Sequence, residues 1–222
     1  MGFNIAGLVI NKNYQDDLAS LENIINKKLV FEKEVDFEQG SENWKEGDYC
    51  DIYFTSEGTL VFLSMEQSAF EFLVPKQKTL SFVLSEMSMT FSINYTRNQY
   101  LIRSIVETEG EVVESKGDSL EFEDTESDKS ELIYHLLEEV LGIRFWDIDY
   151  DEKCYRYSLE SLSTSESVIA EIDEKYTWKM NQIFEEEENN ESTKIDTKTE
   201  ITKVRKPKNT FFTKVWKGLN KK

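Results

Sequence analysis

The sequence predicts an α+β fold in which a mainly antiparallel, meandering sheet packs against two helices. Three patterns support this prediction. Apolar and polar residues alternate through much of residues 80–114, short turn signals separate the alternating segments, and residues 14–28 and 128–141 instead repeat apolar residues at helical spacing. With 222 residues and 39% hydrophobic content, the chain is long enough to bury one core.

The first predicted elements are a strand and a helix. Residues 3–10 form a compact apolar run that predicts a buried strand. The run is too short for a signal peptide or a membrane-spanning helix, so we expect a soluble, cytoplasmic protein with no transmembrane segment. Residues 14–28 are predicted to form a helix whose apolar stripe consists of Tyr14, Leu18, Leu21, Ile25 and Leu29.

A hairpin follows a polar loop at residues 40–47. Residues 50–55 and 59–65 are rich in strand-forming side chains, and the Ser-Glu-Gly sequence between them is typical of a turn. From residue 80 the apolar positions alternate, but they change parity at Ser85 and Glu86. A slip of one residue would turn every core side chain into water, so this change predicts two strands or one bulged strand.

The meander is predicted to continue and to end at a second helix. Turns at residues 96–98 and at Gly110 separate segments 99–107 and 111–114. Asp128 suits the N-cap of a helix at 128–141, with Glu131 three positions later, and Gly142 suits its left-handed end. The buried face of this helix is predicted to contain Leu132, Ile133, Leu136, Leu137, Val140 and Leu141.

The remaining sequence predicts a final strand pair and a C-terminal extension. Residues 145–159 alternate again, as strands do. We expect one body at 1–184 that includes a C-terminal helix at about 165–187, a flexible acidic-to-polar linker at 185–208 and a basic amphipathic tail at 209–222.

Charge divides the chain into two parts of opposite sign. The last 22 residues carry eight Lys or Arg and no acid, whereas the preceding residues hold 18 bases and all 44 acids, so a body of charge −26 and a tail of charge +8 give the chain its net charge of −18. Such a body disfavours specific nucleic acid and favours a basic protein partner. Residues 107–139 contain 13 acids and two bases. They are either a solubilising surface or a docking face, and the candidate partner-binding residues are Glu107, Glu109, Glu111, Glu114, Glu121, Glu123, Asp124 and Glu126.

The basic tail is a second candidate binding segment. Its aromatic and aliphatic side chains recur at helical spacing among lysines, which is typical of a helix that binds an anionic or acidic surface. That surface could be an anionic membrane, another protein, nucleic acid bound without sequence preference, or the acidic body of the chain itself. The candidate residues are Phe211, Phe212, Lys214, Val215, Trp216, Lys217 and Leu219.

The sequence offers little for catalysis. His135 is the single histidine, and no nucleophile motif, phosphate loop or dinucleotide fingerprint accompanies it. Asp147, Asp149 and Asp151 resemble the first half of a calcium loop, but the required glycine and final glutamate are missing, so a solvated strand face is favoured. We predict no catalytic residue, cofactor or metal, and expect a non-enzymatic interaction protein of the inhibitor, immunity or adaptor type. An adaptor that acts through the tail is the first alternative, and an enzyme of unrecognised class is the second.

Overall fold

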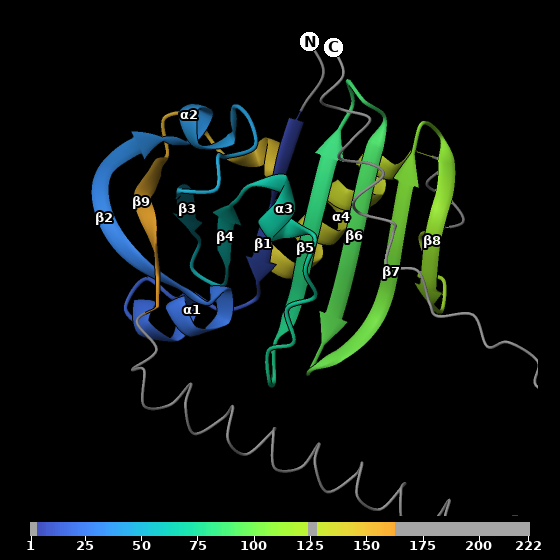
Figure 1. Cartoon of the computed structure of the whole chain (residues 1–222), viewed down its shortest axis with the longest axis horizontal. Coiled ribbons are helices and arrows are strands. Elements are labelled where there is room, and N and C mark those ends of the chain that lie inside the picture. Colours follow the sequence, from blue (N-terminus) through green and yellow to red (C-terminus); the bar gives the residue numbers. More distant parts are fainter. Residues whose placement is uncertain (1–3, 124–127, 163–222) are drawn as a thin grey trace, which may run out of the picture. The chain divides into compact units, whose positions relative to one another are not determined.

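The computed structural model describes residues 4–123 and 128–162, and these form an open, wholly antiparallel sheet with a few helices (Figure 1). The predicted α+β class with a mainly antiparallel sheet is therefore confirmed. The predicted helix at about 165–187, the linker at 185–208 and the tail at 209–222 lie outside the described residues. The strands are β1 (Asn4–Ile10), β2 (Lys27–Asp36), β3 (Tyr49–Phe54), β4 (Thr59–Phe62), β5 (Lys78–Ser85), β6 (Thr90–Arg97), β7 (Tyr100–Thr108), β8 (Glu111–Gly117) and β9 (Lys153–Ser161).

The sheet order combines a long meander, β5 to β8, with two inserted strands, β9 between β2 and β3 and β1 between β4 and β5. The strands lie in the order β2-β9-β3-β4-β1-β5-β6-β7-β8. Strands β5 to β8 follow one another as hairpins, as the alternating pattern predicts, and the change of parity at Ser85 marks the end of β5 before a separate strand β6. The predicted hairpin is β3 and β4. Strand β9 lies between β2 and β3, so residues distant in sequence are neighbours at this end of the sheet (Figure 1).

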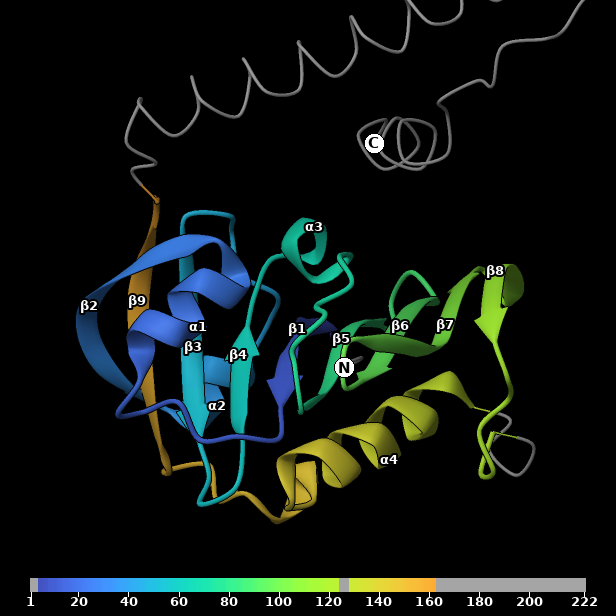
Figure 2. The same ribbon diagram turned by 90° about the horizontal axis from the view of Figure 1, so that it is seen from below.

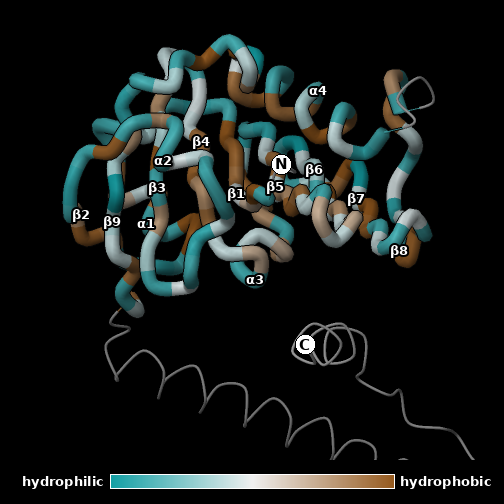
Figure 3. Tube along the Cα trace, turned by 90° about the horizontal axis from the view of Figure 1, so that it is seen from above, coloured by the Kyte–Doolittle hydropathy of each residue, from teal (hydrophilic) through white to brown (hydrophobic). Residues whose placement is uncertain are grey.

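Helices pack on both faces of the sheet. They are α1 (Leu18–Ile25), α2 (Phe37–Ser41), α3 (Met65–Ser68) and α4 (Lys129–Leu141), with a 3-10 turn η1 (Phe145–Asp147). Alternate residues of β1 enter two separate hydrophobic clusters, because successive strand side chains point to opposite faces. The apolar side of α4 packs on β1, β5 and β6, whereas α1 and α3 are seen on the other side of the sheet (Figure 2). The hydrophobic colouring of β1 and of part of α4 marks the cluster that lies between the sheet and α4 (Figure 3).

The second helix begins and ends close to the predicted residues. The Asp128 carboxylate accepts a hydrogen bond from the backbone N–H of Ser130, and Gly142 ends the helix with a φ of 81°. All six residues of its predicted apolar face are buried. These signals were readable because the capping residues and the apolar stripe agree with one another.

The first helix is shorter than predicted. It begins after Asp17, whose carboxylate accepts from the N–H of Ser20, and it ends at Asn26, which is left-handed with a φ of 53°. The Glu22 carboxylate accepts from the N–H of Leu29 at 2.9 Å and draws the chain into β2. The predicted extension to Lys28 was wrong, and residues 27–36 form an edge strand that the sequence analysis missed.

The predicted strand pair at residues 145–159 was also wrong. Phe145 and Trp146 belong to η1 and pack against Tyr134 of α4, with ring centroids 5.5 and 4.9 Å from the Tyr134 ring. A turn follows, and β9 is the single strand that the segment forms within the described residues. Phe145 and Trp146 are consecutive in the sequence, and both rings cover the helix instead of pointing to opposite faces of a strand.

A segment between α3 and β5 lies across the polar face of the meander. The Thr79 and Thr96 hydroxyls lie 2.6 Å apart and 2.7 and 3.1 Å from the backbone carbonyl oxygen of Phe72, and Ser81 donates to the carbonyl of Phe70 at 2.6 Å. Buried hydroxyls on β5 and β6 therefore satisfy backbone groups that the loop could not pair internally. These bonds fix the approach of the chain into β5.

Candidate functional site

Strand β8 forms one end of the sheet and carries two of the eight predicted acidic docking residues, Glu111 and Glu114. It hydrogen-bonds to β7, and no other described strand pairs with it. Six of its seven residues are exposed, and Glu114 is half-buried. An edge strand presents backbone N–H and C=O groups that can accept another strand. The acidic segment is therefore a potential pairing edge as well as a charged surface.

Two adjacent valines are exposed on this edge. Val112 is 55% exposed and Val113 is 42% exposed. The register of β7 and β8 shifts here, so that Glu107 lies opposite Val112 and Val106 lies opposite Glu114. This β-bulge leaves Val113 without a register partner and bends the strand locally. The result is a small apolar surface inside an acidic segment.

Carboxylates border the two valines. Glu107 is on β7, Glu109 and Gly110 form the turn into β8, and Glu111 begins β8. Glu109 and Glu111 are exposed, and so is Glu121 in the segment after β8. Glu114 pairs with Lys116, with 2.6 Å between Oε1 and Nζ, and this contact raises the pKa of the lysine. The β8 edge, defined as residues 107–117, thus combines an apolar centre with a mostly unneutralised acidic border.

Glu123 has a different role from the other predicted acids. Its carboxylate accepts two hydrogen bonds from the Arg103 guanidinium, and the two side chains are 10% and 8% exposed. The hydrogen bond from Arg103 is the main reason that the pKa of Glu123 lies below its usual value, although burial opposes the shift. Arg103 also donates to Ser115 Oγ at 2.8 Å and to the carbonyl of Lys116 at 3.1 Å. Glu123 therefore holds β7, β8 and the following segment together, while Asp124 and Glu126 lie outside the described residues.

The single histidine is stacked on an aromatic ring. His135 is exposed on α4, and its ring lies parallel to that of Phe122, with centroids 4.1 Å apart and 2° between the planes. This contact helps to place the segment after β8 against α4. The geometry gives the imidazole a packing role next to the acidic border.

The three aspartates considered for a metal are separated by the local fold. Asp147 belongs to η1, whereas Asp149 and Asp151 lie in the turn that follows, and all three are exposed. The expectation that they share one face of a strand was wrong, because this segment is not a strand. Within residues 4–123 and 128–162, no three His, Cys, Asp or Glu side chains are grouped as metal ligands.

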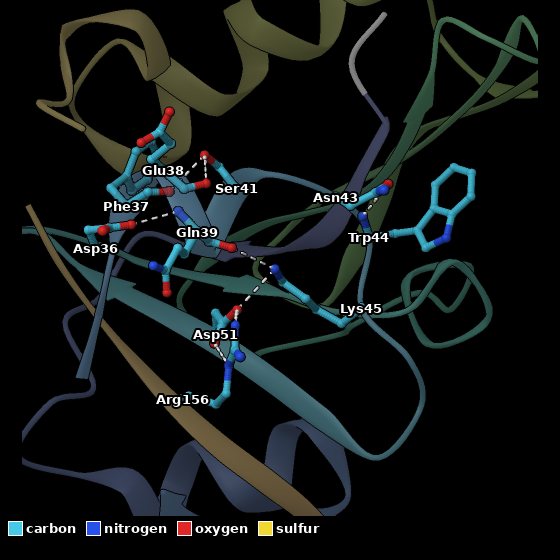
Figure 4. A network of polar contacts seen from close by, with 10 residues as sticks. All are labelled: Asp36, Phe37, Glu38, Gln39, Ser41, Asn43, Trp44, Lys45, Asp51 and Arg156. Atoms are coloured by element: carbon cyan, nitrogen blue, oxygen red, sulfur yellow. Dashed lines mark hydrogen bonds and ion pairs between the residues drawn. The ribbon is translucent and has the colours of Figure 1, made fainter. Parts of the chain in front are cut away.

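A buried ionic network lies beneath α2 (Figure 4). Asp51 on β3 is fully buried, and its carboxylate accepts two hydrogen bonds from Arg156 on β9, at 2.7 and 2.8 Å. Lys45 Nζ lies 2.9 Å from Asp51 Oδ2 and donates to the carbonyl of Gln39 at 3.2 Å. The Lys45 side chain is 3% exposed, so a substrate has no access to the pair. The network joins α2, β3 and β9, and the sequence analysis missed it because Lys45 stands in a segment read as a polar loop.

The two cysteines lie next to this network and are buried free thiols. Burial is the main cause that raises the pKa of both, to about 12 for Cys154, with a further contribution from the Asp51 charge. A thiol is a poor nucleophile in this state, because the reactive form is the thiolate.

A second polar cluster lies at the opposite end of α4 from its N-cap. Glu139 Oε1 accepts from Lys78 Nζ at 2.8 Å and from the Tyr95 hydroxyl at 2.7 Å, and Arg97 Nη2 donates to the Tyr95 oxygen at 3.0 Å. Burial raises the pKa of Glu139, but the bonds from Lys78 and Tyr95 and the nearby charges outweigh it, so its pKa is lowered. Burial is the main cause that raises the pKa of Tyr95 to about 12. The cluster fixes two cationic side chains from neighbouring strands.

Among the helices of the described residues, none combines the length and apolar character needed to cross a membrane. Searches against protein-family models, curated proteins and solved structures find no match.

Proposed function

We propose that the protein is a non-enzymatic interaction protein, of the inhibitor, immunity or adaptor type, that binds a basic protein along the β8 edge. One observation carries this proposal. The exposed Val112 and Val113 lie on an edge strand, and carboxylates of Glu107, Glu109 and Glu111 border them. An apolar centre with a polar rim is the usual anatomy of a protein interface.

The edge supplies three kinds of contact to a cationic partner. The backbone of β8 can pair with an added strand, the two valines exclude water at the centre, and the carboxylates meet Lys or Arg side chains at the border. The net charge of −18 would speed the encounter with a basic protein and disfavour acidic ones. Glu123 acts differently in this proposal, because its bond to Arg103 shapes the edge from within.

A charge-reversal comparison tests the proposal. The wild-type chain and the variant Glu109→Lys/Glu111→Lys are immobilised, and proteins captured from a native lysate are quantified by mass spectrometry. The control is Glu42→Lys/Glu46→Lys, which changes the net charge equally at two exposed acids outside β8. We expect a basic protein to be retained by wild type and control and depleted at least tenfold by the edge variant. Equal capture by all three chains, or capture of no basic protein, would refute it.

The composition of residues 201–222 favours a second candidate, an adaptor that binds an anionic membrane or another protein through its tail. Flotation with anionic vesicles compares the full chain with a chain that ends at Glu200. Flotation of the full chain alone supports the adaptor. If neither chain floats, the membrane form of this candidate is wrong. If the tail instead binds the acidic body, Trp216 fluorescence in the full chain will be protected from a soluble quencher at low salt and exposed at high salt.

A further inference from the structure

An open pocket of about 410 Å³ lies where three loops or strand ends meet. One wall follows β1, a second is the entry to β5, and the third is the turn between β6 and β7. The residues that line it are Asn11, Lys76, Gln77, Lys78, Arg97 and Asn98. All six carry amide, ammonium or guanidinium groups, and none is an acid, in a chain whose net charge is −18.

Hydrogen bonds between the walls fix the two asparagines. Asn11 Oδ1 accepts from the backbone N–H of Lys78 at 2.6 Å, and Asn98 Oδ1 accepts from that of Lys76 at 2.9 Å. The backbone N–H of Asn98 donates in turn to the carbonyl of Gln77 at 2.7 Å. Since each amide oxygen faces an N–H, the orientation of both amides is determined by chemistry.

In both asparagines the side-chain oxygen is already hydrogen-bonded, so the amide nitrogen remains as a donor. The side-chain nitrogens of Asn11 and Asn98, and the Lys76 ammonium, have no hydrogen-bond partner within the described part of the chain. One nitrogen of the Arg97 guanidinium, Nη2, donates to the Tyr95 hydroxyl and to Glu139, and the other nitrogens remain as donors. A ligand entering this pocket meets N–H groups, so it must offer acceptors.

The charged side chains that line the pocket are all cationic, which also favours an anionic ligand. Lys76, Lys78 and Arg97 line the pocket, and the carboxylate paired with two of them is Glu139. Glu139 stays ionised because its pKa is lowered by these contacts, so it orients Lys78 and Arg97 without cancelling all three cations. Arg and Lys beside amide donors are the groups that bind phosphate and carboxylate oxygens in proteins.

We infer that this pocket is a binding site for a small oxyanion, the phosphate or carboxylate group of a low-molecular-weight ligand. The Arg97 fork and the Lys76 ammonium contact the anionic oxygens, and the amide nitrogens of Asn11 and Asn98 orient them. The remaining volume accommodates the rest of a small molecule. The site is separate from the β8 edge and does not depend on the function proposed for that edge.

An isosteric substitution tests the site. Asn98→Asp keeps the oxygen that accepts from Lys76, and Asp tolerates the left-handed backbone at this turn, where φ is 51°. It replaces the donor nitrogen by an anionic oxygen that repels the ligand. The control Asn43→Asp makes the same atomic and charge change at an exposed asparagine whose Oδ1 also accepts from a backbone N–H, that of Trp44.

The full-length chain and both variants are labelled with ¹⁵N and titrated with inorganic phosphate, and separately with acetate, at constant ionic strength. We expect saturable shifts of the backbone amides of Lys76, Lys78 and Asn98 in wild type and in the control, with dissociation constants within twofold. Asn98→Asp should raise the dissociation constant at least tenfold. Saturation with phosphate alone assigns a phosphate ligand, and saturation with acetate adds carboxylates. Linear shifts with both anions, or equal binding by Asn98→Asp, would overturn the inference.

Discussion

The Arg103 guanidinium and the Glu123 carboxylate form a doubly hydrogen-bonded ion pair from which water is almost excluded. The same arginine binds Ser115 and the backbone carbonyls of Lys116 and Gly117. The pair therefore determines how β8 lies against β7. The shape of the exposed edge thus depends on Glu123, whose carboxylate is too buried to contact a partner itself.

Removing the charge of Glu123 should make the protein easier to unfold. Glu123→Gln leaves the Arg103 cation buried without its counter-ion, and we expect the free energy of unfolding to fall by about 3 kcal/mol. Urea denaturation followed by circular dichroism measures this change. Glu114→Gln is the matched control, since Glu114 is 42% exposed beside Lys116 and its loss should have a much smaller effect. Equal effects of the two substitutions would contradict the assignment.

The same pair predicts a pH dependence on the acid side. The pKa of Glu123 in the folded protein is below its ordinary value of 4.5, so the unfolded chain binds the proton more tightly. The stabilisation is present above pH 4.5 and is lost as the pH falls through the lower, folded value. The unfolding free energy of wild type should therefore fall more steeply below pH 4.5 than that of Glu123→Gln. Parallel profiles from pH 6 to pH 3 would show that the pair does not titrate in this way.

Two glycines at opposite ends of β8 should differ in their tolerance of a side chain. Both have a φ of 80°, but a Cβ at Gly117 would lie 2.1 Å from the carbonyl oxygen of Ile102, whereas nothing lies within 4 Å of a Cβ at Gly110. Gly110→Ala should cost about 1–2 kcal/mol, the left-handed backbone penalty alone. Gly117→Ala should cost more, because β8 must also move away from β7. Thermal unfolding compares them, and similar melting temperatures would be inconsistent with the close contact.

The buried network at Asp51 should respond unequally to the loss of its members. Asp51→Asn leaves two cations around a neutral amide, so we expect a loss of about 3–5 kcal/mol in unfolding free energy. Lys45→Met removes one buried cation and leaves the two hydrogen bonds of Arg156 with Asp51 intact. We therefore expect Lys45→Met to lower the free energy of unfolding by clearly less than Asp51→Asn does. Chemical denaturation of the two variants provides the measurement, and a greater loss for Lys45→Met would be the opposite of the expected order.

The elements that sequence predicts well are those whose local signals agree. The helix after Asp128 has a cap, a stripe and a terminal glycine, and the hairpins between β5 and β8 have alternation with turn residues. Strand β2 lacks such agreement. It lies at the sheet edge, most of its residues are exposed, and its register shifts between Phe31 and Lys33, so it shows no regular alternation. The signal available in the sequence was the asparagine at position 26, a residue type that ends helices in the left-handed conformation observed here.

The candidate sites were predicted to different degrees. Charge density identified the acidic segment around β8, because runs of glutamate are visible in any sequence. The pairing of Glu123 with Arg103 and the pocket at Lys76 could not be predicted, since each brings together side chains from segments that only the sheet topology makes adjacent. The sequence contains these residues, but their partners depend on strand order.

The insertion of β9 between β2 and β3 has a consequence for synthesis of the chain. Within the described residues, β2 hydrogen-bonds to no strand except β9, which is made more than 100 residues later. While the ribosome is still translating residues 118–152, the hairpins of β5 to β8 can form from local contacts, but β2 and the outer edge of β3 have no strand to pair with. Until Lys153–Ser161 emerges, the lysines and glutamates that β2 exposes disfavour its pairing with the edge of another chain.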